Sequence, residues 1–382
     1  MIDLSLVTAP RIVLTANTAW YLKNFRLGLI RALVERDCEV WVWAPEDRHF
    51  KALAEAGATP IHLPINSKGL NPIEDLRLSF AYRRRLRALR PHALLAFTIK
   101  PVIYGGLVAG RLGIPYLTTI TGLGTAFIRD GWLTRVAEAL YRRGTRKATK
   151  VVFQNPDDRA LFIARGIVEP QRTLLVPGSG IDLQQFQPVP LPSSHSGQAI
   201  FLLIGRMLRD KGVLEYVDAA HALKAEYPQA RFQLLGEADA ANRTAISRAQ
   251  LAAWQAEGVI EYLGESGDVR TQIAAADCVV LPSYREGIPR VLLEGAAMAR
   301  PLVATDVPGC RAVVREGVNG YLCEARSATA LATVMRRIVV MEPAARSALG
   351  REARSGVERD YDERLVIAAY CAALGLGGLQ VR

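Results

Sequence analysis

The sequence AIFLLIGRMLRDKG, residues 199–212, joins an apolar run to a polar turn that has a glycine at each end. The apolar part has the length and composition of a buried strand, and the turn after it leads toward a helix. Similar apolar, β-branched runs alternate with amphipathic stretches along the whole chain. Before this stretch they lie at 11–16, 39–44, 59–63, 92–97, 115–120, 150–154 and 173–177, and after it at 231–236, 259–264, 277–282, 301–305 and 320–323. This alternation is typical of βαβ units on parallel sheets.

A polar stretch rich in Pro and Ser, PVPLPSSHSGQ at 188–198, divides the alternation into two series. We therefore predict an α/β protein with two doubly wound, Rossmann-like domains, at 1–187 and 198–359. The apolar stretch ERLVIAAYCAALG at 363–375 predicts a C-terminal helix, within about 360–382, that packs back on the first domain. Because ligands bind beyond the carboxyl ends of such strands, we expect the two domains to face a central cleft that contains the site.

The formal net charge of +11 favours an anionic partner. Part of this charge is concentrated in two runs, RRRLRALR at 83–90 and RRGTRKATK at 142–150. These runs fit either an ordinary solvated helix face or an amphipathic surface that faces an anionic membrane. They do not favour a nucleic-acid partner, because no stacking aromatic residues are interleaved with the basic ones.

Cysteine spacing and apolar segment length indicate the compartment. The five cysteines are scattered and lack CxxC spacing, which argues against a disulfide framework or a zinc site and fits a reducing compartment. The first residues lack the pattern of a secretory signal, and no run approaches the ~18 apolar residues that a spanning helix needs. We expect a cytoplasmic protein that is soluble or peripheral to a membrane.

The turn after the apolar run 199–204 has a cation next to each of its two glycines. Arg206 and Lys211 lie between Gly205 and Gly212, at the point where a strand would end. Two cations in this place can clamp a diphosphate and neutralise the charge that grows on a phosphate leaving group. The order GxxxxGK[ST] is absent, so this is not a Walker loop. The alternative is a surface turn with ordinary charges.

A second stretch, YREGIPRVLLEG at 284–295, carries two acids. Pro289 suits the first position of a helix, and the free N–H groups of Gly287 and Ile288 would make an anion site there. Glu294 would lie roughly 7.5 Å along that helix, at ~1.5 Å per residue, within a ribose's reach of a diphosphate. Glu286 would face the transferred sugar. The alternatives are a structural buried acid for Glu294 and a helix N-terminal charge for Glu286.

These two motifs, in this order, resemble those of the retaining nucleotide-sugar glycosyltransferases of family 4, which adopt the GT-B fold. The resemblance covers essentially the whole chain. It implies that Arg206 and Lys211 bind the donor diphosphate, that Glu294 binds the ribose, and that Glu286 contacts the donor sugar. It implies no metal and no cofactor besides the nucleotide-sugar co-substrate. The first domain would bind the acceptor and the second the donor.

Further stretches, among them 15–33, 97–110, 121–127 and 234–247, look like those of the subgroup that acts on polyprenyl-diphosphate-linked sugars. Within it they resemble the bacterial N-acetylgalactosaminyltransferases that extend undecaprenyl-diphosphate-linked diacetylbacillosamine. The implied donor is a UDP-linked N-acetylhexosamine, and the implied location is the cytoplasmic face of the inner membrane, at its anionic surface.

The first domain departs from the wider family in two places. Asn17-Thr18-Ala19 replaces a common Gly-Gly loop, and Thr121-Gly122 replaces a common histidine. Donor contacts from this domain are therefore open. We expect Lys100, which follows the run 92–97, to meet the acceptor diphosphate. Asn17 and the glycines Gly122 and Gly124 would lie nearby, and the alternative for Lys100 is an ordinary loop lysine.

Other classes of function fit these residues less well. A glycoside hydrolase uses two carboxylates but has no need of a diphosphate clamp. A dinucleotide oxidoreductase is disfavoured because no GxGxxG follows the first strand. A nucleotide-sugar epimerase of the same fold, a family-4 transferase with a non-lipid acceptor, and a binding protein without activity remain as alternatives. The favoured hypothesis is a retaining hexosyltransferase that assembles bacterial glycans.

Overall fold

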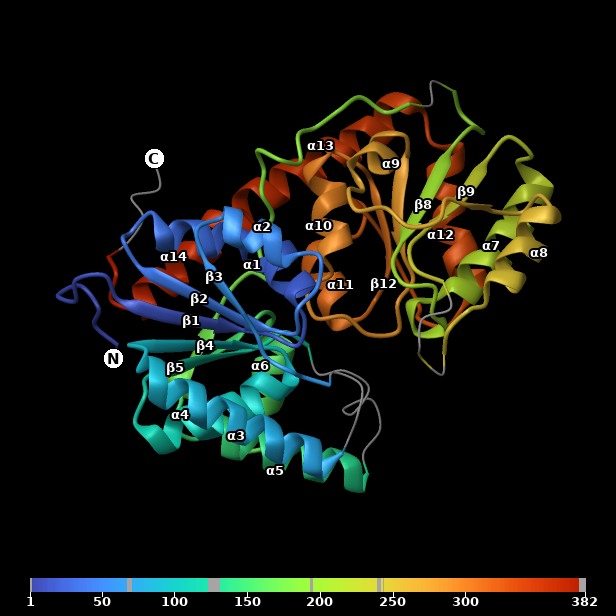
Figure 1. Ribbon diagram of the computed structural model, residues 1–382. Helices are drawn as coiled ribbons and strands as arrows, with labels where there is room; N and C mark the ends of the chain where they lie inside the picture. The colour runs from blue at the N-terminus through green and yellow to red at the C-terminus, as the bar shows by residue number, and fades with distance from the viewer. Residues whose placement is uncertain are drawn as a thin grey trace. The chain divides into compact units, whose positions relative to one another are not determined.

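The computed structural model describes residues 2–66, 71–122, 131–192, 195–238, 242 and 244–377. They form two compact units, and each has a parallel sheet with helices on both faces (Figure 1). The first unit comprises residues 1–180 together with 363–382, and the second comprises 181–362. The second unit thus begins before the polar stretch at 188–198.

The first unit contains a seven-stranded sheet in the order β3-β2-β1-β4-β5-β6-β7. Its strands are β1 (Arg11–Thr15), β2 (Glu39–Ala44), β3 (Thr59–His62), β4 (Ala93–Phe97), β5 (Tyr116–Ile120), β6 (Lys150–Phe153) and β7 (Thr173–Leu175). Its helices are α1 (Ala19–Val34), α2 (Phe50–Glu55), α3 (Pro72–Leu89), the π-helix η1 (Pro101–Gly105), α4 (Gly106–Leu112), α5 (Trp132–Thr145), α6 (Pro156–Ala164), the 3₁₀ helix η3 (Pro170–Arg172) and α14 (Glu363–Ala373).

Alternate residues of one strand supply the two cores of this unit. In β1, Ile12 and Leu14 contact the cluster that includes α1 and α14, whereas Val13 contacts the cluster that includes α3 and α4. Figure 1 accordingly shows α1, α2 and α14 on one face of the sheet and α3, α4 and α5 on the other. Strands buried on both faces explain the continuous apolar runs in the sequence.

The C-terminal helix α14 belongs to the first unit. Its Tyr370 hydroxyl forms a 2.7 Å hydrogen bond with the Thr119 hydroxyl of β5, 251 positions earlier in the chain. Tyr370 also lies beside the fully buried guanidinium of Arg26, which Phe97 covers at 4.6 Å from the ring centroid. The helix therefore completes the core of a unit whose other elements precede residue 181.

The second unit contains a six-stranded sheet in the order β10-β9-β8-β11-β12-β13. Its strands are β8 (Ile200–Ile204), β9 (Arg231–Leu235), β10 (Glu261–Tyr262), β11 (Cys278–Leu281), β12 (Leu302–Thr305) and β13 (Gly320–Cys323). Its helices are the 3₁₀ helix η4 (Arg209–Lys211), α7 (Val213–Glu226), α8 (Arg248–Ala256), α9 (Arg270–Ala274), α10 (Arg290–Ala297), α11 (Pro308–Val313), α12 (Ala328–Val340) and α13 (Pro343–Asp360). These observations confirm the prediction of two doubly wound, parallel-sheet domains.

Candidate active site

The strand order of each sheet reverses direction at one place, and this place determines where loops can hold a ligand. In the second unit the reversal lies between β8 and β11, which pair through Phe201 and Cys278. In the first unit it lies between β1 and β4. At such a point the loops at the carboxyl ends of the two strands diverge and leave a crevice. Every residue that the sequence singled out for the donor follows β8 or β11.

The loop after β8 is held against the loop after β11 by backbone contacts. Gly212 has φ +73°, and a Cβ atom there would overlap the carbonyl oxygen of Pro282. The N–H of Tyr284 donates to the carbonyl oxygen of Asp210 at 3.0 Å. Only glycine suits position 212, because the conformation is left-handed and the space is filled by backbone. The two motifs are therefore fixed side by side.

Lys211 and Glu286, 75 positions apart in sequence, form an ion pair across these two loops. The Lys211 side chain is 27% exposed and the Glu286 side chain 13%. The ammonium and the carboxylate are thus partly desolvated, which strengthens their interaction with each other and with a ligand. Arg206 is exposed, and its guanidinium has no polar partner among the described residues. Arg206 can therefore bind an anion without first breaking an interaction with another described residue.

The segment between Glu286 and α10 offers backbone donors. The N–H groups of Gly287 and Ile288 make no hydrogen bond within the described part of the chain. Pro289 is the N-cap residue, with extended backbone, and α10 begins at Arg290. Pro289 thus precedes the helix instead of occupying its first position, a shift of one residue from the prediction. The unpaired amides and the helix N-terminus together favour an anion.

Glu294, on α10, forms an ion pair with Arg290 one turn earlier, at 2.9 Å between Nε and Oε1. Burial raises the pKa of the Glu294 carboxyl, and the positive charge of Arg290 opposes this effect. The side chain remains 13% exposed. Arg290 holds the carboxylate in one orientation, which the sequence did not indicate, although the i,i+4 spacing of the two residues was a usable signal.

The loop after β12 also contributes, and the sequence did not indicate it. A Cβ atom at Gly309, on α11, would overlap the carbonyl oxygen of Gly287. The next residue, Cys310, is buried, and burial together with the nearby Glu286 raises the pKa of its thiol. Gly309 therefore supports the backbone of the anion site directly. The available signal was a glycine one residue after Pro308, just beyond a predicted strand.

Lys100, in the first unit, is 7% exposed, and its ammonium lies 2.7 Å from the carboxylate of Asp75 on α3. The same carboxylate accepts a 2.7 Å hydrogen bond from the hydroxyl of Tyr104, within the π-helix η1. Burial and then Asp75 raise the pKa of Tyr104. An acceptor diphosphate would have to compete with Asp75 for this lysine.

Asn17 follows β1 and Thr98 follows β4, so both lie at the reversal point of the first sheet. The N–H of Asn17 donates to the Thr98 hydroxyl at 2.9 Å, and the buried Asn17 side-chain oxygen has no partner within the described residues. Thr98 has φ +65°, which is strained for a β-branched residue. Gly122 has φ +139°, and Gly124 lies outside the described residues. Sequence reasoning missed Thr98.

No cluster of three or more His, Cys, Asp or Glu side chains in the described part of the chain is arranged to hold a metal ion. The groups assembled after β8 and β11 are instead cations, two carboxylates and free amides. This set suits a ligand that carries both phosphate oxygens and sugar hydroxyls.

Comparison with known proteins agrees with this chemistry. Residues 24–178 match the family profile described as "Glycosyl transferase 4-like domain", and residues 198–340 match "Glycosyl transferases group 1". The chain belongs to the family-4 glycosyltransferases. Its fold is GT-B, and its activity is glycosyl transfer of the hexosyltransferase type.

Three known proteins show what the chain is similar to in sequence or in fold. An N,N'-diacetylbacillosaminyl-diphospho-undecaprenol alpha-1,3-N-acetylgalactosaminyltransferase of Campylobacter jejuni is 27% identical, over 91% of this chain and 93% of the relative. An Escherichia coli UDP-Gal:alpha-D-GlcNAc-diphosphoundecaprenol alpha-1,3-galactosyltransferase is 21% identical, over 69% and 70%. The Anabaena protein HepE, solved in complex with UDP and glucose, has a TM-score of 0.75 and 20% identity, with 95% of this chain and 98% of that chain covered.

Proposed function

We propose that this glycosyltransferase moves an N-acetylhexosamine from a UDP donor to a polyprenyl-diphosphate-linked saccharide, with retention at the anomeric carbon. The Campylobacter and Escherichia relatives, named for undecaprenyl-diphosphate-linked acceptors, support the acceptor class. The second of them is named for a UDP donor. The alternatives are a nucleotide-sugar epimerase of the same fold and a family-4 transferase with a non-lipid acceptor.

One observation carries the donor assignment: the Lys211–Glu286 ion pair beside the free amides of Gly287 and Ile288. An arriving diphosphate would bind the ammonium and the amides. It would thereby release Glu286 to accept hydrogen bonds from the transferred sugar. Arg206 would bind the other phosphate, and Glu294, oriented by Arg290, would accept from the ribose hydroxyls.

The chemistry follows from the charge that develops on the leaving group. As the bond from the anomeric carbon to the β-phosphate oxygen breaks, negative charge grows on UDP, and Arg206, Lys211 and the amides stabilise it. We assign front-face attack by the acceptor hydroxyl, with its proton passing to the departing phosphate oxygen. The residues would then act by positioning and by electrostatic stabilisation, without a protein nucleophile.

The acceptor would bind to the first unit. Lys100 is the proposed contact for the acceptor diphosphate, and Asn17, Gly122 and Gly124 are proposed to lie around it. The unpartnered Asn17 oxygen supports a polar ligand at this sheet end. Lys100→Ala should raise the KM for the lipid acceptor about tenfold or more while UDP binding is unchanged. Tyr104→Phe is the control, since it alters the same Asp75 contact but keeps the ammonium; equal acceptor KM in both variants would contradict the role.

We place the enzyme peripherally at the cytoplasmic face of the inner membrane, at its anionic surface. The net charge of +11 and the lipid-linked acceptor class support this location. Among the helices of the described residues, none combines the length and the apolar composition of a membrane-spanning segment.

A donor screen tests the function. UDP-N-acetylhexosamines and other nucleotide sugars would be incubated with short polyprenyl-diphosphate saccharides. Mass spectrometry would identify the product, and NMR would assign its anomeric linkage. We expect one added N-acetylhexosamine, lost on Glu286→Ala and on Lys211→Ala by at least a hundredfold. Arg336→Ala and Glu226→Ala, which break an exposed ion pair of the same unit, are the controls. Free product without an acceptor would favour the epimerase, and activity in both site variants would refute the site.

A further inference from the structure

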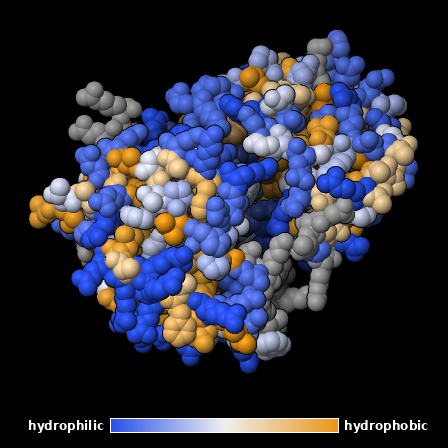
Figure 2. All heavy atoms as spheres, viewed as in Figure 1, coloured by the Kyte–Doolittle hydropathy of each residue, from blue (hydrophilic) through white to orange (hydrophobic). Residues whose placement is uncertain are grey.

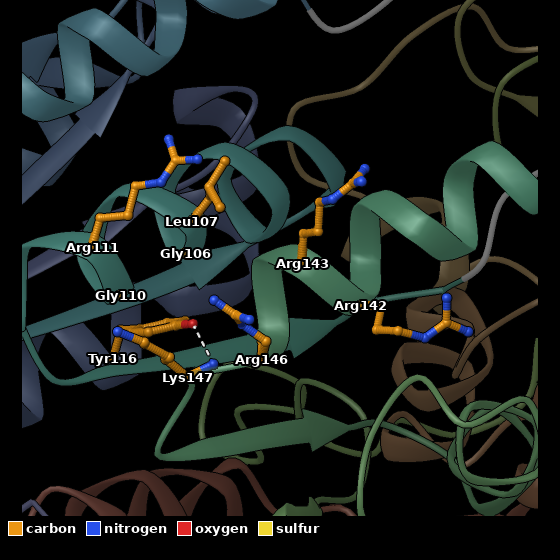
Figure 3. Close-up of a pocket in the computed structure, with 9 residues that line it drawn as sticks. All are labelled: Gly106, Leu107, Gly110, Arg111, Tyr116, Arg142, Arg143, Arg146 and Lys147. Atoms are coloured by element: carbon orange, nitrogen blue, oxygen red, sulfur yellow. Dashed lines mark hydrogen bonds between the residues drawn. The ribbon is translucent and has the colours of Figure 1, made fainter.

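The first unit contains a basic pocket that the proposed donor and acceptor residues do not use. It lies between α4 and α5 and has a volume of 390 Å³ (Figure 3). Five of the residues that line it are cations: Arg111, Arg142, Arg143, Arg146 and Lys147. Among the described residues, no acidic side chain lines it. We call it the α4–α5 pocket.

Close backbone packing of the two helices forms this pocket. A Cβ atom at Gly106 would lie 2.5 Å from the carbonyl oxygen of Gly144, so α4 and α5 approach without side chains between them. The hydroxyl of Tyr116 donates to that carbonyl oxygen at 2.9 Å and accepts from the N–H of Lys147 at 3.2 Å. The segment that carries the cations is therefore held in place by buried contacts, not left as a free loop.

Helix capping explains only one of the five charges. Arg142 donates to the carbonyl oxygens of Arg165 and Gly166 at 3.1 Å each, and in Figure 3 it points away from the other cations. The side chains of the other four make no hydrogen bond or ion pair within the described residues. Four like charges without counter-ions repel one another, and an anion in the pocket would relieve this repulsion.

The pocket is separate from the candidate acceptor site. Tyr116 is the first residue of β5, so the pocket lies at the amino end of the strands. Asn17, Thr98 and Gly122 lie at the carboxyl ends of β1, β4 and β5 of the same sheet. An anion in the α4–α5 pocket would thus be bound at the opposite end of the sheet from the acceptor residues.

Exposed apolar side chains on the helices that cover the same face of the sheet indicate which kind of molecule contains the anionic group. On α3, which packs on α4, Ile73, Leu76 and Phe80 share one face and are each more than half exposed. Trp132, at the start of α5, is 73% exposed. Figure 2 shows hydrophobic residues next to strongly hydrophilic ones over this part of the unit. Exposed apolar and aromatic residues beside arginines are typical of helices that lie in a membrane interface.

We infer that the α4–α5 pocket binds the phosphate headgroup of an acidic phospholipid, while the apolar side chains toward the opposite ends of α3 and α5 enter the acyl boundary of the same membrane face. This inference rests on the proposed membrane location, and it is independent of the donor site. It assigns Arg143, Arg146 and Lys147 of the basic run at 142–150 to lipid recognition instead of an ordinary solvated helix face.

Vesicle sedimentation tests the inference. The full chain should bind vesicles of phosphatidylcholine mixed with phosphatidylglycerol, and it should not bind phosphatidylcholine alone. The site variant is Arg143→Ala/Arg146→Ala/Lys147→Ala. The matched control is Arg31→Ala/Arg48→Ala/Lys51→Ala, which removes the same charge from exposed positions of the same unit. We expect the site variant to bind roughly a hundredfold more weakly, and the control to change severalfold at most.

Two further variants distinguish binding in a specific pocket from general electrostatic attraction to the vesicle surface. Leu107→Trp, which keeps every charge, should fill the pocket and weaken binding of soluble short-chain phosphatidylglycerol. Phe80→Ser should weaken vesicle binding but leave that soluble lipid bound. Equal losses in the site and control variants would overturn the pocket and spare the membrane location. Failure of the unaltered chain to bind acidic vesicles would overturn both. Inorganic pyrophosphate binding that the site variant abolishes, in a chain that does not bind vesicles, would overturn the lipid assignment.

Discussion

Lys211 and Glu286 satisfy each other when no ligand is bound. Their ion pair keeps two partly buried charges from remaining uncompensated, which would cost several kcal/mol. In the proposed site, the arrival of one anion would change the partner of both residues together. Glu294 and Arg290 form a similar pair on α10, so each acid of the site has its own cation.

Glu294→Gln tests this arrangement through pH. Because burial raises the pKa of Glu294 above its ordinary 4.5, ionisation costs the folded chain more than the unfolded chain. The free energy of unfolding of the wild type should therefore fall, relative to the variant, as the pH rises through 4.5 toward the raised folded value. Urea unfolding on both sides of pH 4.5 measures this difference. UDP should bind the variant about tenfold more weakly. A stability difference that does not change with pH would contradict the buried carboxylate.

At the level of secondary structure, the candidate site is built from the loops that follow three neighbouring strands. β8, β11 and β12 are neighbours in the sheet. The segments that follow them, 205–212, 282–289 and 306–309, therefore all begin at the carboxyl ends of adjacent strands. Glycines at 212 and 309 allow these segments to approach backbone to backbone. This contact, more than any side chain, fixes the amides of Gly287 and Ile288.

Gly309→Ala should distort the anion site. Its Cβ atom would overlap the carbonyl oxygen of Gly287, and a backbone atom cannot move as a flexible side chain can. We expect a loss of about 1–3 kcal/mol in the free energy of unfolding and at least a tenfold loss in transfer rate. Thermal unfolding and initial rates measure the two effects. Gly267→Ala is the control, because a Cβ atom there meets nothing within 4 Å. Equal behaviour of the two variants would show that the contact is unimportant.

The chain crosses between the two units twice, and this determines how the whole molecule can be divided. The second unit is one continuous segment, 181–362, whereas the first needs α14 from the C-terminal end. Val366, Ile367 and Tyr370 are buried in the first unit's core. Each such side chain contributes about 1.5–3 kcal/mol when buried, a large part of the roughly 5–15 kcal/mol net stability of a domain.

A chain that ends at Asp362 should therefore retain the second unit and lose the first. Limited proteolysis followed by mass spectrometry should find cleavage within 1–180 and protection of 181–362. In the full chain, Tyr370→Ala should destabilise the first unit by about 3–5 kcal/mol. Leu365→Ala, on the exposed side of α14, should change it by less than about 1 kcal/mol. Protection of 1–180 in the shortened chain would contradict this view of α14.

The strand–helix alternation and the two proposed donor motifs could be recognised in the sequence because they are local. An apolar run of about five residues, a glycine after it and an acid spaced along one helix depend on near neighbours alone. The prediction of two parallel-sheet domains was confirmed, and it needed no knowledge of which strands pair. The placement of Arg206, Lys211, Glu286 and Glu294 after strands had the same origin.

Only the tertiary structure decided the partners of these residues. Strand order places residue 211 beside 286, Gly309 under Gly287, and Lys100 against Asp75, and no local spacing encodes any of these contacts. The same holds for the α4–α5 pocket, whose cations come from a run visible in the sequence but whose enclosure depends on Gly106 and Gly144 meeting. Local pattern sets which groups a loop carries. Burial and strand order set which group each one meets, since contacts between distant residues form only when the sheet assembles.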